Sequence, residues 1–122
     1  SGTSQFWVPI NSTTESTGGP GNIEEWHTWI APYDGKLLKV LIRAKGYNSS
    51  YGGSTAVGLH INRNTSAATT VTETIGSDST VTFTFSSSNT FSAGDLITLS
   101  VDPSVVMGDV TLCGVWEYDS TT

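Results

Sequence analysis

The stretch IAPYDGKLLKVLIRA, residues 30–44, places a compact turn directly before a long alternating segment. Pro32 fixes φ at the first central position of a turn, and Gly35 can adopt the positive φ that other residues resist. Asp34 can accept a hydrogen bond from the backbone of the turn. The stretch therefore predicts a sharp corner that leads into a β-strand over residues 36–45, and it requires no catalytic explanation.

The predicted strand has two unlike faces, because successive side chains point to opposite sides of a strand. One face is wholly aliphatic and consists of Leu38, Val40, Ile42 and Ala44. The other face mixes aliphatic with basic residues and ends at Lys45. Such a mixture is unusual for a face open to solvent, so it favours a subunit interface or partial cover by a loop. The candidate interface residues are Leu37, Lys39, Leu41 and Arg43.

The composition describes one acidic domain that is rich in hydroxyl side chains. The 122 residues are enough for a single core, so we expect one domain over residues 1–122. A net charge of −6 argues against a nucleic-acid partner, which needs a basic face, and against an anionic membrane surface. Abundant Thr favours strands, and abundant Ser, Gly and Asn favour turns. We therefore expect an all-β fold with no nucleic-acid or membrane partner.

Segments of period two recur along the chain and are separated by turn signals. They predict about eight strands, over residues 5–10, 24–31, 36–45, 55–63, 69–75, 79–86, 96–101 and 110–118. Eight strands is the number in a two-sheet jelly roll. We therefore predict an antiparallel β-sandwich with jelly-roll topology, in which Val81, Phe83 and Phe85 form a stripe of the core.

Several side chains have expected environments of their own. In the strand over 55–63, Val57, Leu59 and Ile61 are expected to point inward and His60 outward. His27, which stands near two tryptophans in the sequence, is expected to be packed or hydrogen-bonded. Cys113 is expected to be a buried thiol, because its neighbours are mostly apolar and no second cysteine can pair with it.

The sequence marks no enzyme. A triad could combine His60 with one of many serines and with Asp34 or Asp95, but no GxSxG-like context marks a nucleophile. Glu117 and Asp119 could share a face, as glycoside hydrolysis would require, but no cleft is recognisable. We predict no catalytic residue, and a small carbohydrate-active enzyme is a remote alternative.

The sequence also predicts no metal and no cofactor. One cysteine and two distant histidines do not form a zinc pattern. Asp95, Asp102 and Asp109 lie around the last two predicted strands and could hold a cation, although no calcium-binding loop motif is present. The alternative is that these aspartates end turns and remain solvated.

The loop GYNSSYGGS, residues 46–54, is the best candidate for ligand binding. Tyr47 and Tyr51 offer a ring for stacking on a sugar and a hydroxyl for hydrogen bonds, in a composition typical of recognition loops. Asn48 and the outward-facing His60 complete the candidate ligand-binding set. The alternative is that the tyrosines pack over the end of the sandwich or against a neighbouring subunit.

Three segments, IAPYDGKLLKVLIRA, FSAGDLITLSVDP and GDVTLCGVWEYD, resemble the C-terminal domains of structural proteins from tailed bacteriophages of marine bacteria. The opening FWVPINSTTES is similar to the start of such a domain, so the resemblance covers nearly the whole chain. An APxDG turn followed later by AGDxIxLxV also resembles trimeric jelly rolls of the tumour-necrosis-factor-like class and bacterial spore-surface filaments. The shared motifs are turns and strands of the scaffold, and they supply no binding residues.

The resemblance implies a homotrimeric knob with about ten strands, so one or two short strands within residues 11–23 or 46–54 would add to the eight. It implies a non-enzymatic virion structural protein at the particle surface, namely a tail-fibre domain whose loops attach to a host-surface glycan or protein. The alternative is a capsid decoration or head-fibre protein. The implied partners are copies of the chain and other virion proteins.

Overall fold

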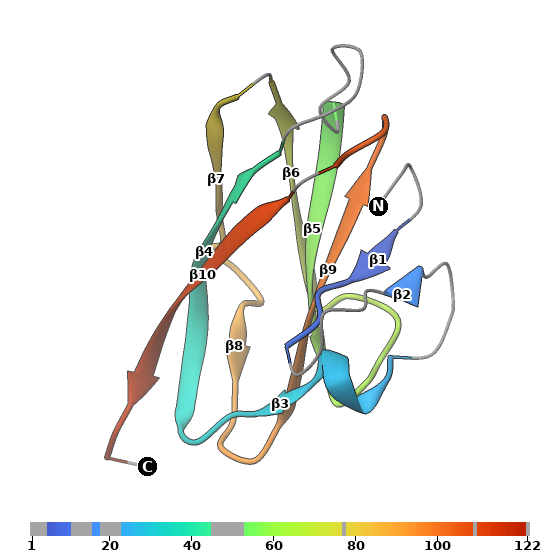
Figure 1. The fold of residues 1–122 in the computed structure, drawn as a ribbon. Coiled ribbons are helices and arrows are strands. Elements are labelled where there is room, and N and C mark those ends of the chain that lie inside the picture. Colours follow the sequence, from blue (N-terminus) through green and yellow to red (C-terminus); the bar gives the residue numbers. More distant parts are fainter. Residues whose placement is uncertain are drawn as a thin grey trace.

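The computed structural model describes residues 5–10, 16–17, 23–44, 53–76, 78–108 and 110–121. Its two antiparallel sheets pack face to face as a β-sandwich (Figure 1), which confirms the predicted fold class. The larger sheet contains β1 (Phe6–Trp7), β2 (Ser16–Thr17), β3 (Trp29–Ile30), β5 (Gly53–Ile61), β6 (Thr69–Ile75) and β9 (Leu96–Pro103). The smaller sheet contains β4 (Asp34–Arg43), β7 (Thr80–Thr84), β8 (Thr90–Phe91) and β10 (Thr111–Asp119).

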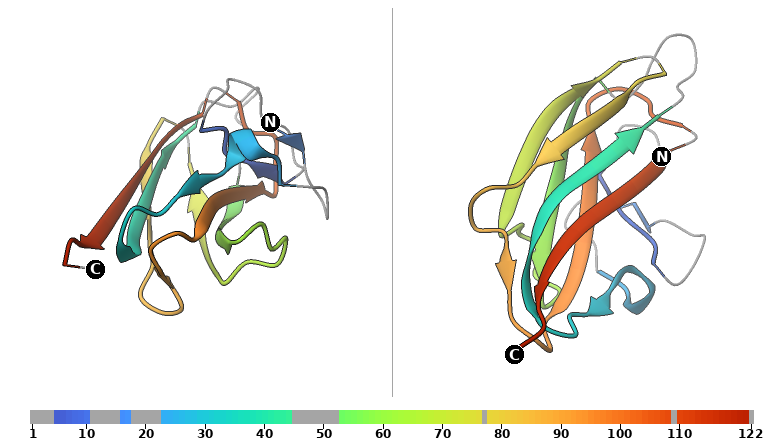
Figure 2. Two further views of the ribbon diagram at one scale, coloured as in Figure 1. Left: turned by 90° about the horizontal axis from the view of Figure 1, so that it is seen from below. Right: turned by 90° about the vertical axis from the view of Figure 1, so that its left-hand side faces the viewer.

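The chain passes repeatedly from one sheet to the other. The larger sheet has the order β2-β1-β9-β5-β6, with β3 also paired to β9, and the smaller has the order β10-β4-β7, with β8 paired to β4. The chain therefore changes sheet from β3 to β4, β4 to β5, β6 to β7, β8 to β9 and β9 to β10. Figure 2 shows the resulting layers, with β10 and β4 side by side in the smaller sheet. Strands that follow one another in the chain therefore often lie in different sheets.

The described residues contain ten strands, two more than the alternation predicts. β2 lies within the segment 11–23, where the resemblance allows for a missed strand. β8 is unexpected, since it is a two-residue strand that pairs with the start of β4. The jelly-roll topology and the trimer stay predictions.

The core lies between the sheets and is built from alternate residues of the long strands. Val57 and Leu59 on β5 are fully buried, and so is Phe83 on β7, as predicted. Phe85 is also buried, and Val81 packs against the core at its edge. Each large apolar side chain of this core contributes about 1.5–3 kcal/mol to folding when it is fully buried.

A β-bulge in β4 changes which side chains enter the core. Along β10, the pairing with β4 steps from Lys39 directly to Leu37, so Leu38 is the extra residue. The bulge resets the alternation, and Leu37 and Val40 are therefore both fully buried although they are three positions apart. The predicted face that groups Leu37 with Lys39 and Leu41 is wrong at Leu37, which belongs to the core.

Asn89 holds the backbone at the bulge. Its side-chain amide donates to the carbonyl oxygen of Leu37 at 2.7 Å and to that of Phe85 at 3.2 Å. The backbone N–H of Leu37 donates in turn to the carbonyl oxygen of Asn89 at 2.9 Å, and that of Phe85 donates to Leu38 at 2.9 Å. β7 stops pairing with β4 at this point, and these bonds satisfy the backbone groups that would otherwise be buried without a partner. The bulge therefore carries no penalty for burying unpaired polar groups.

Two other expectations are wrong. Residues 25–27 form a 3-10 helix, η1 (Glu25–His27), so the strand expected over 24–31 is reduced to β3. Cys113 is exposed and not buried, because side chains alternate along β10 and Leu112 takes the side that faces the larger sheet. His27 is fully buried, as expected.

The turn that opens the sequence docks onto the turn at 92–95. The backbone N–H of Ala31 donates to the carbonyl oxygen of Asp95 at 2.9 Å, and that of Gly94 donates to Ala31 at 2.8 Å. The Asp34 carboxylate accepts from the backbone N–H of Ala93 at 2.7 Å, across 59 positions of sequence. Gly94 has a φ of +89°, a conformation that favours glycine. We call this arrangement the corner, because it joins the ends of both sheets.

The bulge predicts unequal costs for two neighbouring leucines. Leu37→Ala should lower the free energy of unfolding by about 2–5 kcal/mol, because it leaves a cavity in the core. Leu41→Ala is the matched control and should cost less, since Leu41 is only half-buried. Urea unfolding of both variants measures the difference. An equal or larger cost for Leu41→Ala would contradict the bulge.

The corner predicts a measurable effect for one carboxylate. Asp34→Ala should lower the free energy of unfolding by about 1 kcal/mol, because its hydrogen bond to Ala93 is exposed and solvent weakens it. Asp102→Ala, at an exposed position of β9, should change it by no more than about 0.5 kcal/mol. Thermal unfolding at one pH compares the two, and similar costs would refute a special role for Asp34.

Candidate functional site

The predicted ligand-binding residues do not come together in the part of the chain that the structure describes. Tyr47, Asn48 and Tyr51 lie outside the described residues. His60 is described and is only 1% exposed, so the expectation of an outward, accessible imidazole is wrong. The His60 side chain does point away from the core, but Trp7 and the turn after β5 cover this part of the outer face of the larger sheet.

His60 lies in a buried polar cluster on that outer face. Its Nδ1 lies 2.8 Å from the carbonyl oxygen of Asn64, and its Nε2 lies 2.7 Å from Oγ of Ser100. Because a carbonyl can only accept, Nδ1 carries the proton and Nε2 accepts from the serine hydroxyl. Trp7 packs edge-on against the imidazole, with ring centroids 4.8 Å apart. Gly58 is required beside them, since a Cβ there would lie 2.7 Å from Oγ of Ser100.

The serine and histidine have the relative geometry of a nucleophile and its general base, but a substrate cannot reach them. Ser100 is 2% exposed, and His60 is equally enclosed. Burial lowers the pKa of His60, and the hydrogen bond to Asn64 opposes part of that shift. A neutral imidazole is therefore held in place by its hydrogen bonds, and the cluster positions the turn over residues 62–68 against the sheet.

His27 is the second buried histidine, and it caps η1. Its Nδ1 accepts a hydrogen bond from the backbone N–H of Glu24 at 3.0 Å, so Nε2 carries the proton. Burial lowers the pKa of His27, and the negative charge of Glu24 opposes the shift. His27 Nε2, Trp7 Nε1 and Thr98 Oγ1 are buried and have no hydrogen-bond partner among the described residues.

These two histidines predict that the protein loses stability in mild acid. Both pKa values are lower in the folded chain than the ordinary value of about 6.5, so the unfolded chain takes up protons first. Above pH 6.5 the two histidines should therefore leave the free energy of unfolding unchanged. Below pH 6.5 they should lower it as the pH drops. Unfolding in urea at a series of pH values between 8 and 5 measures this dependence.

The double variant His27→Gln/His60→Gln is the control, because it cannot gain these two protons. It should show a clearly weaker dependence on pH below 6.5 than the parent chain. An equally steep loss of stability in the parent chain and in the double variant would show that protonation of carboxylates causes the loss.

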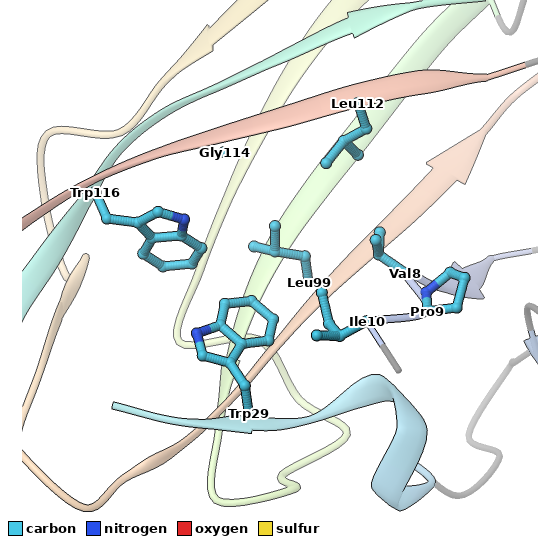
Figure 3. Close-up of a pocket in the computed structure, with 8 residues that line it drawn as sticks. All are labelled: Val8, Pro9, Ile10, Trp29, Leu99, Leu112, Gly114 and Trp116. Atoms are coloured by element: carbon cyan, nitrogen blue, oxygen red, sulfur yellow. The ribbon is translucent and has the colours of Figure 1, made fainter. Parts of the chain in front are cut away.

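A concave feature lies between the sheets along β10, and we call it the open groove (Figure 3). Its volume is about 480 Å³. β10 forms one wall, and β9, β3 and the segment after β1 form the other. Its lining residues are Val8, Pro9, Ile10, Trp29, Leu99, Leu112, Gly114 and Trp116.

Two tryptophans face each other across the open groove. The rings of Trp29 and Trp116 meet edge to face, with centroids 5.1 Å apart and planes at 85°. Phe91 supports Trp116 from behind at 5.9 Å. Gly114 leaves space for the indole, since a Cβ at that position would lie 2.9 Å from its Nε1. The groove therefore has a rigid aromatic wall that reaches the surface.

Two exposed apolar side chains lie at one end of the groove. Ile10 lines the groove, and its backbone N–H donates to the carbonyl oxygen of Trp26 on η1 at 2.8 Å. Both side chains are exposed. Exposed apolar side chains beside an apolar groove are typical of an interaction site.

The edge of β10 borders the same groove. Among the described residues β10 pairs only with β4, so its other edge has no strand beside it. No lining residue of the groove is charged. The site can therefore hold apolar side chains, whereas a sugar would require more hydrogen-bonding groups than the lining offers.

The acidic positions do not form a metal site in the described part of the chain. No group of three His, Cys, Asp or Glu side chains that could hold an ion occurs there. The Asp95 carboxylate accepts from the backbone N–H of Ser92 at 2.8 Å and from the Asn62 side chain at 3.3 Å, so it ends a turn. Asp102 is exposed on β9, and Asp109 lies outside the described residues.

Three of the four predicted interface residues share the outer face of the smaller sheet. Lys39 and Arg43 are exposed and Leu41 is half-buried, whereas Leu37 lies in the core. Arg43 makes a surface ion pair with Asp78 at 3.8 Å. Whether this face contacts another chain stays a prediction.

Comparison with protein-family models, with curated proteins and with solved structures found no match. No described helix is long and apolar enough to span a membrane. The open groove was not predicted from the sequence, because Trp29 and Trp116 are 87 positions apart in the chain and nothing local links them.

Proposed function

We propose that this chain is a non-enzymatic virion structural domain of a tailed bacteriophage, which forms a homotrimeric jelly-roll knob of a tail fibre. Its loops would attach the particle to a host-surface glycan or protein. Many weak contacts, repeated over three chains and several fibres, would give firm attachment without any tight single site.

The strand order supports a jelly roll. β9 lies between β1 and β5, and β4 lies between β10 and β7, while β6 passes directly into β7 in the other sheet. This is the order expected when a long antiparallel hairpin is wound around a barrel, with its outermost first strand left out.

The three motif segments meet in the fold. Ala31 and Asp34 come from the first motif and bond to Ala93 and Gly94 of the second. Tyr118 of the third motif contacts Tyr33 of the first. The motif residues therefore form one connected part of the scaffold, which is the role that the resemblance implies for them.

The open groove is the observation that carries the proposal of an assembled, non-catalytic protein. Its apolar lining and the unpaired edge of β10 favour contact with protein, not with a polar substrate. The one nucleophile-and-base arrangement described, Ser100 with His60, is buried. A structural protein that is complete only as an oligomer fits both features.

Light scattering near neutral pH tests the proposed assembly. We expect a solution mass three times the chain mass of 12.9 kDa. A monomer at all accessible concentrations would contradict the homotrimer. Binding of the labelled trimer to host cells would then support the tail-fibre role, and binding to purified capsids instead would favour a decoration or head-fibre protein.

A further inference from the structure

We infer that the open groove of one copy receives the outer face of the smaller sheet of a second copy, with Lys39 of that second copy beside Glu25. This inference rests on the proposed homotrimer and names the two surfaces that form its contact. The occupant is a second copy of this chain, because the two surfaces are complementary in charge and in polarity.

The groove side is acidic as well as apolar. η1 borders the groove, since the carbonyl oxygen of Trp26 accepts from the backbone N–H of Ile10 at 2.8 Å. Figure 3 shows η1 leading directly into the strand that carries Trp29. Glu24 and Glu25 lie here, and the described segments 5–10 and 23–33 contain no lysine or arginine. This wall of the groove therefore favours a cationic partner.

The opposite charge is concentrated on one strand. Lys36, Lys39 and Arg43 all belong to β4, and they are three of the five bases of a chain with a net charge of −6. Leu41 and Val115, both half-buried, lie among them on the same outer face. This face thus offers bases around a small apolar centre, which is opposite in charge to Glu24 and Glu25 at one end of the apolar groove.

The charges already paired within the chain single out one contact. Lys36 lies 3.6 Å from Glu117, and Arg43 has Asp78 as its partner. Lys39 lies between them and makes no ion pair with any described residue. Glu25 is exposed and equally without an ion pair among the described residues. Lys39 and Glu25 are therefore the charges most available for a contact between copies.

The two surfaces are different parts of one molecule, so the contact is heterologous. Each copy offers its groove to one neighbour and its β4 face to the other. Such contacts close into a ring when the rotation between copies divides a full turn. In a three-membered ring every groove is occupied and every β4 face is covered. A heterologous contact is therefore compatible with the proposed trimer.

Charge reversal tests the inference on the full chain. Lys39→Glu and Glu25→Lys should each weaken self-association about tenfold or more, as sedimentation at several protein concentrations measures. The double variant should recover most of the lost affinity, because the two charges are exchanged. Glu73→Lys, which makes the same charge change at an exposed position of β6, is the matched control and should leave association unchanged.

A second pair of variants tests the apolar part without relying on charge. Ile10 lines the groove, so Ile10→Asp should prevent assembly, while Val106→Asp, at a similarly exposed position beyond β9, should not. Assembly that survives both Glu25→Lys and Ile10→Asp would overturn this use of the groove and leave the trimer standing. A parent chain that never associates would instead overturn the proposed trimer itself.

Discussion

The corner is the constraint that ties the two sheets together at one end. The backbone N–H of Ala93 donates to the carboxylate of Asp34, which joins the residue that opens β4 to the turn that precedes β9. The bonds between Ala31 and its partners Gly94 and Asp95 hold the same place. β4 and β9 are the central strands of their sheets, so the corner sets the ends of the two strands around which the other strands pair.

The corner closes one end of the sandwich, but the side along β10 remains open. There the sheets diverge around Trp29 and Trp116, and the edge of β10 has no described neighbour. A chain with no disulfide and a modest core gains from covering such a surface by association. The proposed function and the proposed contact between copies both derive from this opening.

Alternation and turn residues were sufficient to predict the sandwich and most long strands, but not the details that decide exposure. The bulge at Leu38 was unpredictable because Leu37 and Leu38 are equally apolar neighbours, so the sequence does not say which of them enters the core. The burial of His60 depends on a turn folding back over the sheet, which alternation does not describe. The candidate site escaped prediction for a related reason, since the open groove exists only where residues distant in sequence meet.

Native-state hydrogen exchange, followed by NMR, tests the central role of the corner most directly. The account predicts that the amides of Ala31, Ala93 and Gly94 exchange only through global unfolding, with the same free energy as the amide of Leu99 in the middle of β9. Exchange of the corner amides at a much lower free energy, while the strands stay protected, would show that the corner opens on its own. The sheets would then hold their arrangement without it, and the account would be wrong.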